Sequence, residues 1–233
     1  MLALRSTLFA IVFYSWTALY SLGMTPLLIC PRGWCVVAMR FWSRTVIVLL
    51  RVICGIRVEV RGAPPQGPAL IAAKHQSALD VYAEFAWLPD SCFVAKKELR
   101  KIPGFGWWAL KARMIYVDRE GGSGALKKLV RDAQDRLKDS RQVLIFPEGT
   151  RRPLGAEPDY KPGVAALYRE LGMPVSPLAT NSGAHWPRKG FRMTPGTIVF
   201  EYLEPIPPGL KRGEFMRLLE ERIEDASARL ARL

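Results

Sequence analysis

Short apolar runs alternate along the chain with segments whose apolar residues recur at helical spacing. The strand-like runs span 57–60, 69–73, 93–95, 142–146, 174–179 and 197–202. Helical periodicity appears in 124–138, in 164–171 and in the apolar stripe of 215–230. Because strands and helices alternate, we predict an α/β domain with a mixed, largely parallel sheet flanked by helices.

The first long apolar segment lies at the N-terminus. No charged residue occurs between Arg5 and Arg32, and this run of 26 residues is long enough to span a bilayer. A signal peptide is not indicated, because a single Arg precedes the run and no small-x-small cleavage site ends it. Pro26, Pro31 and Gly33 then break the helix.

The second apolar segment, 34–56, carries Arg40, Arg44 and Arg51 within about 40° of one another on one helical face. A spanning helix would bury such cations at a cost of about 2.5 to 3.5 kcal/mol each, so an interfacial helix is favoured. We therefore predict a membrane-associating two-helix hairpin over 1–56, seated mainly in the cytoplasmic leaflet, and an α/β domain over 57–233. A first helix that spans the membrane is an equally open alternative.

The chain is strongly basic, with 34 Lys and Arg against 21 Asp and Glu and a net charge of +13. This balance suits an anionic partner, either lipid headgroups or nucleic acid. No zinc-finger spacing, heptad repeat or aromatic-basic signature supports nucleic acid. We therefore expect the chain to bind anionic membrane lipids and no nucleic acid.

The four cysteines, Cys30, Cys35, Cys54 and Cys92, show no C-x-x-C spacing and have no neighbouring His. We expect them to be reduced thiols of a cytosol-facing protein, with no metal site. The sequence contains no nucleotide-binding signature either, so we expect no cofactor.

The most informative polar stretch follows the run 69–73 and contains His75, Ser77 and Asp80. On a continuous helix the side chains of His75 and Asp80 would lie about 140° apart and turn away from each other. If His75 lies on the turn before the helix, Asp80 can reach back to one imidazole nitrogen and leave the other basic. Alternatively, Ser77 and Asp80 form a capping box that only starts a helix. These residues alone leave both interpretations open.

A second polar stretch, F-P-E-G-T-R-R over 146–152, follows the apolar run that begins at Gln142. A glycine beside Thr and two Arg can offer backbone N–H groups and a planar guanidinium to an oxyanion such as phosphate. Basic loops are usually only solvated, so this stretch is a weak signal by itself. Arg151 and Arg152 are adjacent, and the sequence does not decide which of them would bind the phosphate.

Together, H-x4-D at 75–80 and F-P-E-G-T-R at 146–151 resemble the glycerolipid acyltransferases, and among them the bacterial 1-acyl-sn-glycerol-3-phosphate acyltransferases. The resemblance implies an O-acyltransferase of phospholipid biosynthesis. Such an enzyme transfers an acyl chain from acyl-CoA or an acyl carrier protein to the sn-2 hydroxyl of lysophosphatidic acid, giving phosphatidic acid. We expect it at the inner (cytoplasmic) membrane, with the active site facing the cytoplasm.

The resemblance also implies roles for particular residues. His75 is the general base, and Asp80 orients it. The expected substrate-binding residues are Lys96, Arg119, Glu148, Gly149, Thr150 and Arg151. Among these, Lys96, Arg119 and Arg151 are expected to contact phosphate, whereas Glu148 is expected to fix the Arg151 loop. Ser77 fits a helix cap better than a nucleophile, so no acyl-enzyme is expected.

One position departs from the family pattern, in which Asn often precedes the motif His. This chain has Lys74 there. We expect this cation either to help keep His75 neutral or to point to solvent.

The acceptor is less firmly indicated than the reaction class. Members of the family also acylate glycerol 3-phosphate or other lysolipids, and a cluster of arginines favours an acceptor that carries a phosphate. A different class of function is non-catalytic binding to anionic membranes. That alternative accounts for the charge and the N-terminal segments, but it leaves the pairing of the two motifs unexplained.

Overall fold

The computed structural model describes residues 1–119, 121–189 and 192–232. Its centre is a seven-stranded sheet in the order β1-β7-β6-β2-β5-β3-β4. The strands are β1 (Ile56–Arg61), β2 (Ala69–Ala73), β3 (Ser91–Lys96), β4 (Ile115–Val117), β5 (Gln142–Ile145), β6 (Val175–Thr180) and β7 (Gly196–Tyr202).

Most neighbouring strands are parallel. β2 pairs in parallel with β5 and β6, and β3 pairs in parallel with β5 and β4. β1 and β7 are parallel to each other, but β7 runs antiparallel to β6. The predicted mixed, largely parallel sheet is confirmed. The carboxyl ends of β2 to β6 meet along one side of the sheet, here called the carboxyl edge, where α/β sheets place their ligand-binding residues.

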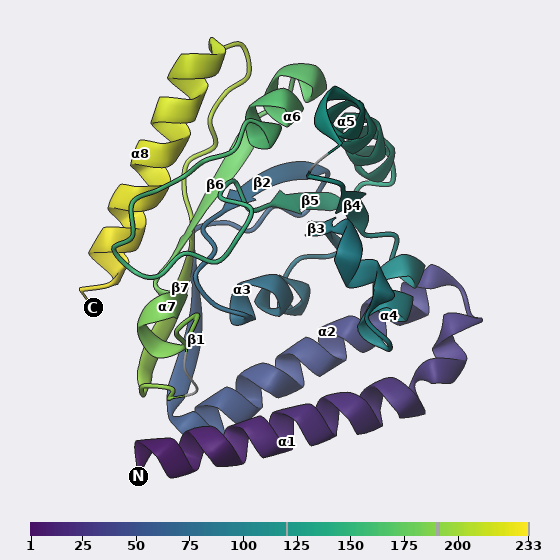
Figure 1. Cartoon of the computed structure of the whole chain (residues 1–233), viewed down its shortest axis with the longest axis vertical. Helices are drawn as coiled ribbons and strands as arrows, with labels where there is room; N and C mark the ends of the chain where they lie inside the picture. Colours follow the sequence, from purple (N-terminus) through teal and green to yellow (C-terminus); the bar gives the residue numbers. More distant parts are fainter. Residues whose placement is uncertain (120, 190–191, 233) are drawn as a thin grey trace.

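Helices flank this sheet. They are α1 (Leu2–Gly23), α2 (Arg32–Leu49), α3 (Leu79–Tyr82), α4 (Phe105–Lys111), α5 (Gly122–Lys138), α6 (Gly163–Leu171), α7 (Ser182–His185) and α8 (Arg212–Leu230). Short turns of other helix types are η1 (Thr25–Leu28), η2 (Leu50–Cys54), η3 (Ala83–Ala86) and η4 (Lys97–Lys101). Figure 1 shows α5, α6 and α8 on one side of the sheet, and α3 between the sheet and the α1–α2 pair on the other.

The apolar pattern of the sequence explains these positions. Every residue of β2 and of β5 is buried, as expected of central parallel strands that are covered on both faces. The predicted stripe of α8 faces the sheet, and its residues Phe215, Leu219, Ile223, Ala226 and Leu230 are all buried. The helical spacing of these residues therefore places α8 against β6.

The two N-terminal helices form the predicted hairpin and also contribute to the main core. Phe9 of α1 and Val46 of α2 are buried in the same apolar cluster as the central strands. Polar contacts add to this, because Arg44 Nε donates to the Ala86 carbonyl at 3.2 Å and Ser43 Oγ donates to the Tyr82 carbonyl at 2.6 Å. The division into a 1–56 unit and a 57–233 unit stays a prediction, and the two parts share one core.

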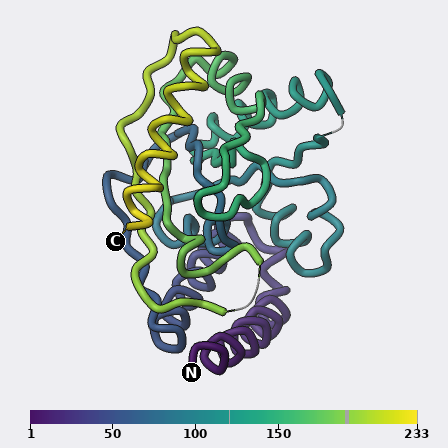
Figure 2. Tube along the Cα trace, turned by 60° about the vertical axis from the view of Figure 1, so that its left-hand side comes forward, coloured from purple at the N-terminus to yellow at the C-terminus, as the bar shows by residue number. Residues whose placement is uncertain are grey.

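The outward side of the hairpin is apolar. α1 is long and apolar enough to cross a membrane, judged by its length and composition. Exposed apolar residues of the hairpin include Leu4, Leu8, Ile11, Leu19, Leu22, Trp34, Val37, Phe41 and Val48. Figure 2, from a second direction, shows α1 and α2 lying side by side at one end of the molecule.

The helix that follows His75 is shorter than the apolar spacing of its residues suggests. The apolar spacing from Val81 to Trp87 indicates a single helix, but α3 ends at Tyr82 and continues as the 3-10 turn η3. Pro89 follows closely, and a proline disfavours helical backbone at the residue before it. The segment therefore turns toward β3 after two short helical turns.

Glu84 of η3 is a buried carboxyl group beneath this turn. Its side chain is fully buried, and Oε2 accepts hydrogen bonds from Trp87 Nε1 at 3.0 Å and from the Tyr202 hydroxyl. Burial raises the pKa of Glu84 to about 8, although the hydrogen bonds from Tyr202 and Trp87 oppose this rise. Near neutral pH the folded protein therefore keeps Glu84 mostly protonated.

We expect Glu84 to make the free energy of unfolding depend on pH. The folded pKa of about 8 exceeds the ordinary value of 4.5, so the folded state holds a proton that the unfolded state loses. The stabilising contribution of this proton is complete below pH 4.5 and is lost as the pH rises to about 8, at about 1.4 kcal/mol per pH unit. Urea unfolding in detergent across this range should show the slope in the wild type and a smaller slope in Glu84→Gln. Identical slopes would contradict a protonated Glu84.

Candidate active site

The turn after β2 places His75 before a helix rather than within one. Strand β2 ends at Ala73, and the Lys74 N–H still donates to the Leu178 carbonyl of β6 at 2.8 Å. Helix α3 begins at Leu79, so Asp80 stands in its first turn. This arrangement lets two residues five positions apart meet, because the chain between them folds back at the carboxyl edge.

The Asp80 carboxylate organises this turn. Oδ2 accepts from the N–H groups of Gln76 and Ser77 at 2.7 and 2.8 Å, and it lies 3.1 Å from His75 Nδ1. Oδ1 accepts from Ser77 Oγ at 3.1 Å, and this hydroxyl in turn accepts from the Leu79 N–H at 3.1 Å. Asp80 thus contacts His75 and also accepts from the Ser77 N–H, but the residue that caps α3 is Ala78, and Ser77 Oγ accepts from the Leu79 N–H instead of that of Asp80.

This geometry determines which imidazole nitrogen is available. An ionised carboxylate only accepts hydrogen bonds, so Nδ1 of His75 carries the proton toward Asp80 and Nε2 is left as the acceptor. The His75 ring stacks on Phe146 with centroids 4.0 Å apart, and the His75 side chain is 13% exposed. His75 is thus held from two sides while its ring keeps some access to solvent.

The loop after β5 is fixed to the His75 turn and to the end of β4. The Arg152 N–H donates to the His75 carbonyl at 2.8 Å. Gly149 has a φ of +64°, and the Arg119 guanidinium donates to its carbonyl. A Cβ at position 149 would lie 3.2 Å from Arg119 Cζ, so the close approach of Arg119 and the positive φ both favour glycine there.

The two adjacent arginines have different surroundings. Arg152 Nη2 donates to Asp159 Oδ2 at 2.5 Å, and Lys161 pairs with the same carboxylate. Arg151 makes no hydrogen bond or ion pair with the described residues. Burial raises the pKa of the Tyr82 phenol, and the charge of Arg151 opposes this rise. Of the two side chains, Arg151 is the one available to a ligand.

Glu148 and Lys74 face each other instead of the open side of the site. Glu148 Oε1 lies 3.0 Å from Lys74 Nζ, and both residues are buried. Burial raises the pKa of Glu148, and the Lys74 ammonium opposes this rise. The expectation that Lys74 points to solvent was wrong, because its side chain is buried and its ammonium is paired with Glu148. The alternative, that Lys74 helps keep His75 neutral, stays a prediction. The role expected for Glu148, fixing the Arg151 loop, stays a prediction, and its hydrogen-bond contact is with Lys74 of the turn after β2.

The remaining predicted residues, Lys96, Thr150 and Arg119, lie along the same carboxyl edge as His75. Lys96 ends β3 opposite Val117 of β4, and its exposed side chain makes no hydrogen bond or ion pair in the part of the chain that the structure describes. Thr150 is half-buried in the loop between Gly149 and Arg151. Partial burial lowers the pKa of Arg119 from its ordinary value. The sheet thus brings four loops to one edge. Contacts link the loops of His75, Arg151 and Arg119, and the ion pair between Lys97 and Asp118 at 2.5 Å ties the segment after Lys96 to that of Arg119.

The sequence interpretation missed the residues that support the site from elsewhere in the chain. Glu224 of α8 and Tyr160 both contact the Lys74 region, and Asp159 holds Arg152. No local spacing could have indicated these contacts, since Glu224 lies 150 positions from Lys74. The second histidine of the chain, His185, has its Nδ1 3.0 Å from the Thr194 carbonyl.

No metal site accompanies these groups. Within residues 1–119, 121–189 and 192–232, no cluster of three or more His, Cys, Asp or Glu side chains is arranged to hold a metal ion. All four cysteines are free.

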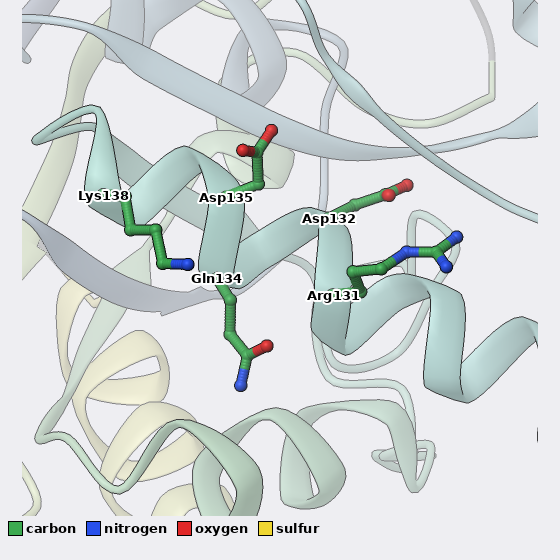
Figure 3. A pocket seen from close by; sticks show the side chains of 5 residues that line it. All are labelled: Arg131, Asp132, Gln134, Asp135 and Lys138. Atoms are coloured by element: carbon green, nitrogen blue, oxygen red, sulfur yellow. The ribbon is translucent and has the colours of Figure 1, made fainter.

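A surface hollow along α5 is lined by Arg131, Asp132, Gln134, Asp135 and Lys138, as Figure 3 shows. The end of α5 leads into the start of β5, so this hollow lies toward the side of the sheet opposite His75.

Known proteins resemble both the sequence and the fold. Residues 56–181 match the family model described as Acyltransferase. The chain is 41% identical over 159 residues to the 1-acyl-sn-glycerol-3-phosphate acyltransferase of Pseudomonas aeruginosa, and the alignment covers 67% of this chain and 62% of that protein. It is 29% identical over 175 residues to the Helicobacter pylori protein of the same name, covering 74% and 73%. The alignment thus spans less than two thirds of the Pseudomonas protein.

A solved structure resembles the whole fold. It is the crystal structure of the 1-acyl-sn-glycerophosphate (LPA) acyltransferase, PlsC, from Thermotoga maritima, with a TM-score of 0.80. The match covers 99% of this chain and 98% of that chain at 23% sequence identity. At this identity the likeness establishes the common fold, including the N-terminal helices.

Proposed function

The chain belongs to the Acyltransferase family, and from this premise we propose that it is a 1-acylglycerol-3-phosphate O-acyltransferase. It transfers an acyl chain from a thioester to the sn-2 hydroxyl of lysophosphatidic acid, giving phosphatidic acid and a free thiol. The observation that carries this proposal is His75, whose Nδ1 is held by Asp80 while Nε2 makes no hydrogen bond with the residues that the structure describes. The name of the Pseudomonas relative supports the acceptor.

In the proposed reaction His75 Nε2 takes the proton of the acceptor hydroxyl as the hydroxyl oxygen attacks the thioester carbonyl. The Asp80 carboxylate stabilises the imidazolium that forms, at 3.1 Å from Nδ1. The tetrahedral intermediate then expels the thiolate, which receives the proton from His75. Ser77 is fully buried and hydrogen-bonded to both Leu79 and Asp80, so it supports the turn and is not a nucleophile.

The acceptor phosphate is proposed to bind at the loop after β5. Arg151 is the principal ligand, since Arg152 is already paired with Asp159. Arg119 lies beside Gly149, and Lys96 stands at the end of β3 on the same edge. The backbone of Gly149 and Thr150 completes the loop, and Glu148 holds it from the interior. Binding of the phosphate at this loop would hold the acceptor hydroxyl close to His75.

A lipid acceptor fits this position better than a soluble one such as glycerol 3-phosphate. Tyr82, two positions after Asp80 on α3, packs against Phe13 of α1 and Trp42 of α2. The proposed phosphate site therefore adjoins the hairpin, whose outward side is apolar. The acyl donor is acyl-CoA or an acyl carrier protein, since both present the same thioester. The chemistry needs no resident cofactor.

We place the protein at the inner (cytoplasmic) membrane, with its active site facing the cytoplasm and the hairpin in contact with anionic lipids. The exposed apolar residues of α1 and α2 support this location, as does the net charge of +13. Arg44 of α2 and Arg51 of η2 are exposed among apolar neighbours, which suits the headgroup region better than the bilayer centre.

The reaction can be tested with purified protein in detergent by following thiol release from an acyl-CoA. Release should require lysophosphatidic acid, with glycerol 3-phosphate and lysophosphatidylcholine as comparison acceptors. The variant His75→Ala should lower kcat by about 10² to 10⁴ with little change in acceptor KM, because it removes the general base. Near-normal turnover in this variant would exclude the mechanism. If neither acyl-CoA nor an acyl carrier protein serves as donor while vesicle binding persists, the non-catalytic alternative is favoured.

Phosphate binding distinguishes the two arginines. Arg151→Ala should raise the acceptor KM by about 10- to 100-fold, the loss expected for a hydrogen bond to a charged group. The donor KM should remain unchanged. Arg152→Ala is the matched comparison and should have the smaller effect on acceptor KM, since its guanidinium pairs with Asp159. An unchanged acceptor KM in Arg151→Ala would remove this residue from the site.

The seating of the hairpin can be tested by labelling. A cysteine introduced as Leu2→Cys should resist an impermeant thiol reagent added to intact spheroplasts and should react after permeabilisation, because the hairpin is proposed to stay in the cytoplasmic leaflet. The parent chain serves as the control for its own four cysteines. Labelling of Leu2→Cys from outside would instead indicate that α1 spans the membrane.

A further inference from the structure

A group of paired charges adjoins the candidate active site. The Lys74 ammonium lies 3.0 Å from Glu148 Oε1, and 2.7 and 2.8 Å from the two carboxylate oxygens of Glu224. The Tyr160 hydroxyl donates to Glu224 Oε1 at 2.9 Å. The side chains of Lys74 and Glu148 are 3% and 1% exposed, and that of Glu224 is 26% exposed. These four residues are called the Lys74 cluster below.

The Lys74 cluster joins three segments that are distant in the sequence. Lys74 is the residue before His75, at the end of β2. Glu148 belongs to the loop after β5, the loop that also carries Arg151. Glu224 lies on α8, outside the residues 56–181 that match the family model. A helix beyond the matched region therefore reaches the two loops that carry the proposed base and phosphate ligand.

The charges explain why Lys74 holds this arrangement together. One cation stands between two carboxylates, and Glu148 Oε2 is buried without a hydrogen bond among the described residues. The hydrogen bond between Glu148 Oε1 and Lys74 Nζ is therefore what ties the Glu148 carboxylate to the described residues around it. Without the ammonium, Glu148 would face the Glu224 carboxylate in a buried setting. Both the lost hydrogen bond and the repulsion would displace the loop.

We infer that Lys74 and Glu224 are positioning residues for the acyl transfer, an inference that rests on the function proposed above. Lys74 fixes the turn that carries His75 and, through Glu148, the loop that carries Arg151. Glu224 anchors Lys74 from α8, and Tyr160 orients the Glu224 carboxylate. The distance between His75, the proposed base, and Arg151, the proposed phosphate ligand, is thereby kept constant. Acyl transfer requires this, because it depends on holding the acceptor hydroxyl close to His75.

The test compares Lys74→Met with Arg229→Met in the thiol-release assay, below the melting temperature of each variant. Arg229 is the matched control because it also joins α8 to the sheet, through Glu201 at 2.9 Å. Lys74→Met should lower kcat and raise acceptor KM, with a combined loss in kcat/KM of about 10- to 100-fold. Arg229→Met should keep the wild-type values. Adding Glu148→Gln to Lys74→Met should restore part of the loss, because it removes the unpaired charge.

A second measurement does not depend on activity. Hydrogen exchange of the backbone amides in 146–152 should be faster in Lys74→Met and unchanged in Arg229→Met. Glu224→Gln, which retains an acceptor for Tyr160, should show a smaller effect in the same direction and serves if Lys74→Met does not fold. Equal exchange in the cluster variants and in Arg229→Met would overturn the inference. If the wild type transfers no acyl chain, the proposed function fails, and the exchange data still decide whether the cluster holds the loop.

Discussion

The arrangement of the candidate site depends on one buried carboxylate. Asp80 is 2% exposed, and a charge so buried is tolerated only where donors surround it. Those donors are two backbone N–H groups, one hydroxyl and the His75 ring, all from the six residues 75–80. The need to surround the Asp80 carboxylate with donors therefore determines three features together. These are the shape of the turn, the start of α3 and the orientation of His75. The Phe146 ring and the Arg152 N–H then fix the neighbouring loop to that turn.

Much of the fold followed from local pattern. The run 69–73 coincides with β2, because a strand buried on both faces must be continuously apolar and the flanking residues are polar. The helices of 124–138 and 215–230 were indicated by one-sided apolar spacing, which packing on a sheet requires. The order of strands was not indicated. Nothing in the residues of β1 and β7 tells that they pair with each other at one side of the sheet.

In the candidate site, contacts between residues close in sequence could be predicted, whereas contacts between distant segments could not. The contact between His75 and Asp80 could be anticipated because five residues of chain constrain it. The choice between Arg151 and Arg152 could not, since it depends on Asp159 in a loop without periodicity. Lys74 shows the limit most clearly. From the sequence it was a cation beside the histidine, whereas its surroundings are set by Glu148 and Glu224, which only the folded sheet and α8 bring near.

The contacts of the hairpin with late parts of the chain bear on how the protein is made. Phe9 packs against Trp186 with ring centroids 5.5 Å apart, Ser6 Oγ accepts from the Met193 N–H at 2.8 Å, and β1 pairs with β7. During synthesis the hairpin leaves the ribosome before these partners do. A nascent chain whose first helices have already entered lipid must close its sheet beside the bilayer, by contacts of large sequence separation that form slowly. With the proposed membrane seating of the hairpin, pairing of β1 with β7 becomes a late step of an assembly that is completed at the membrane surface.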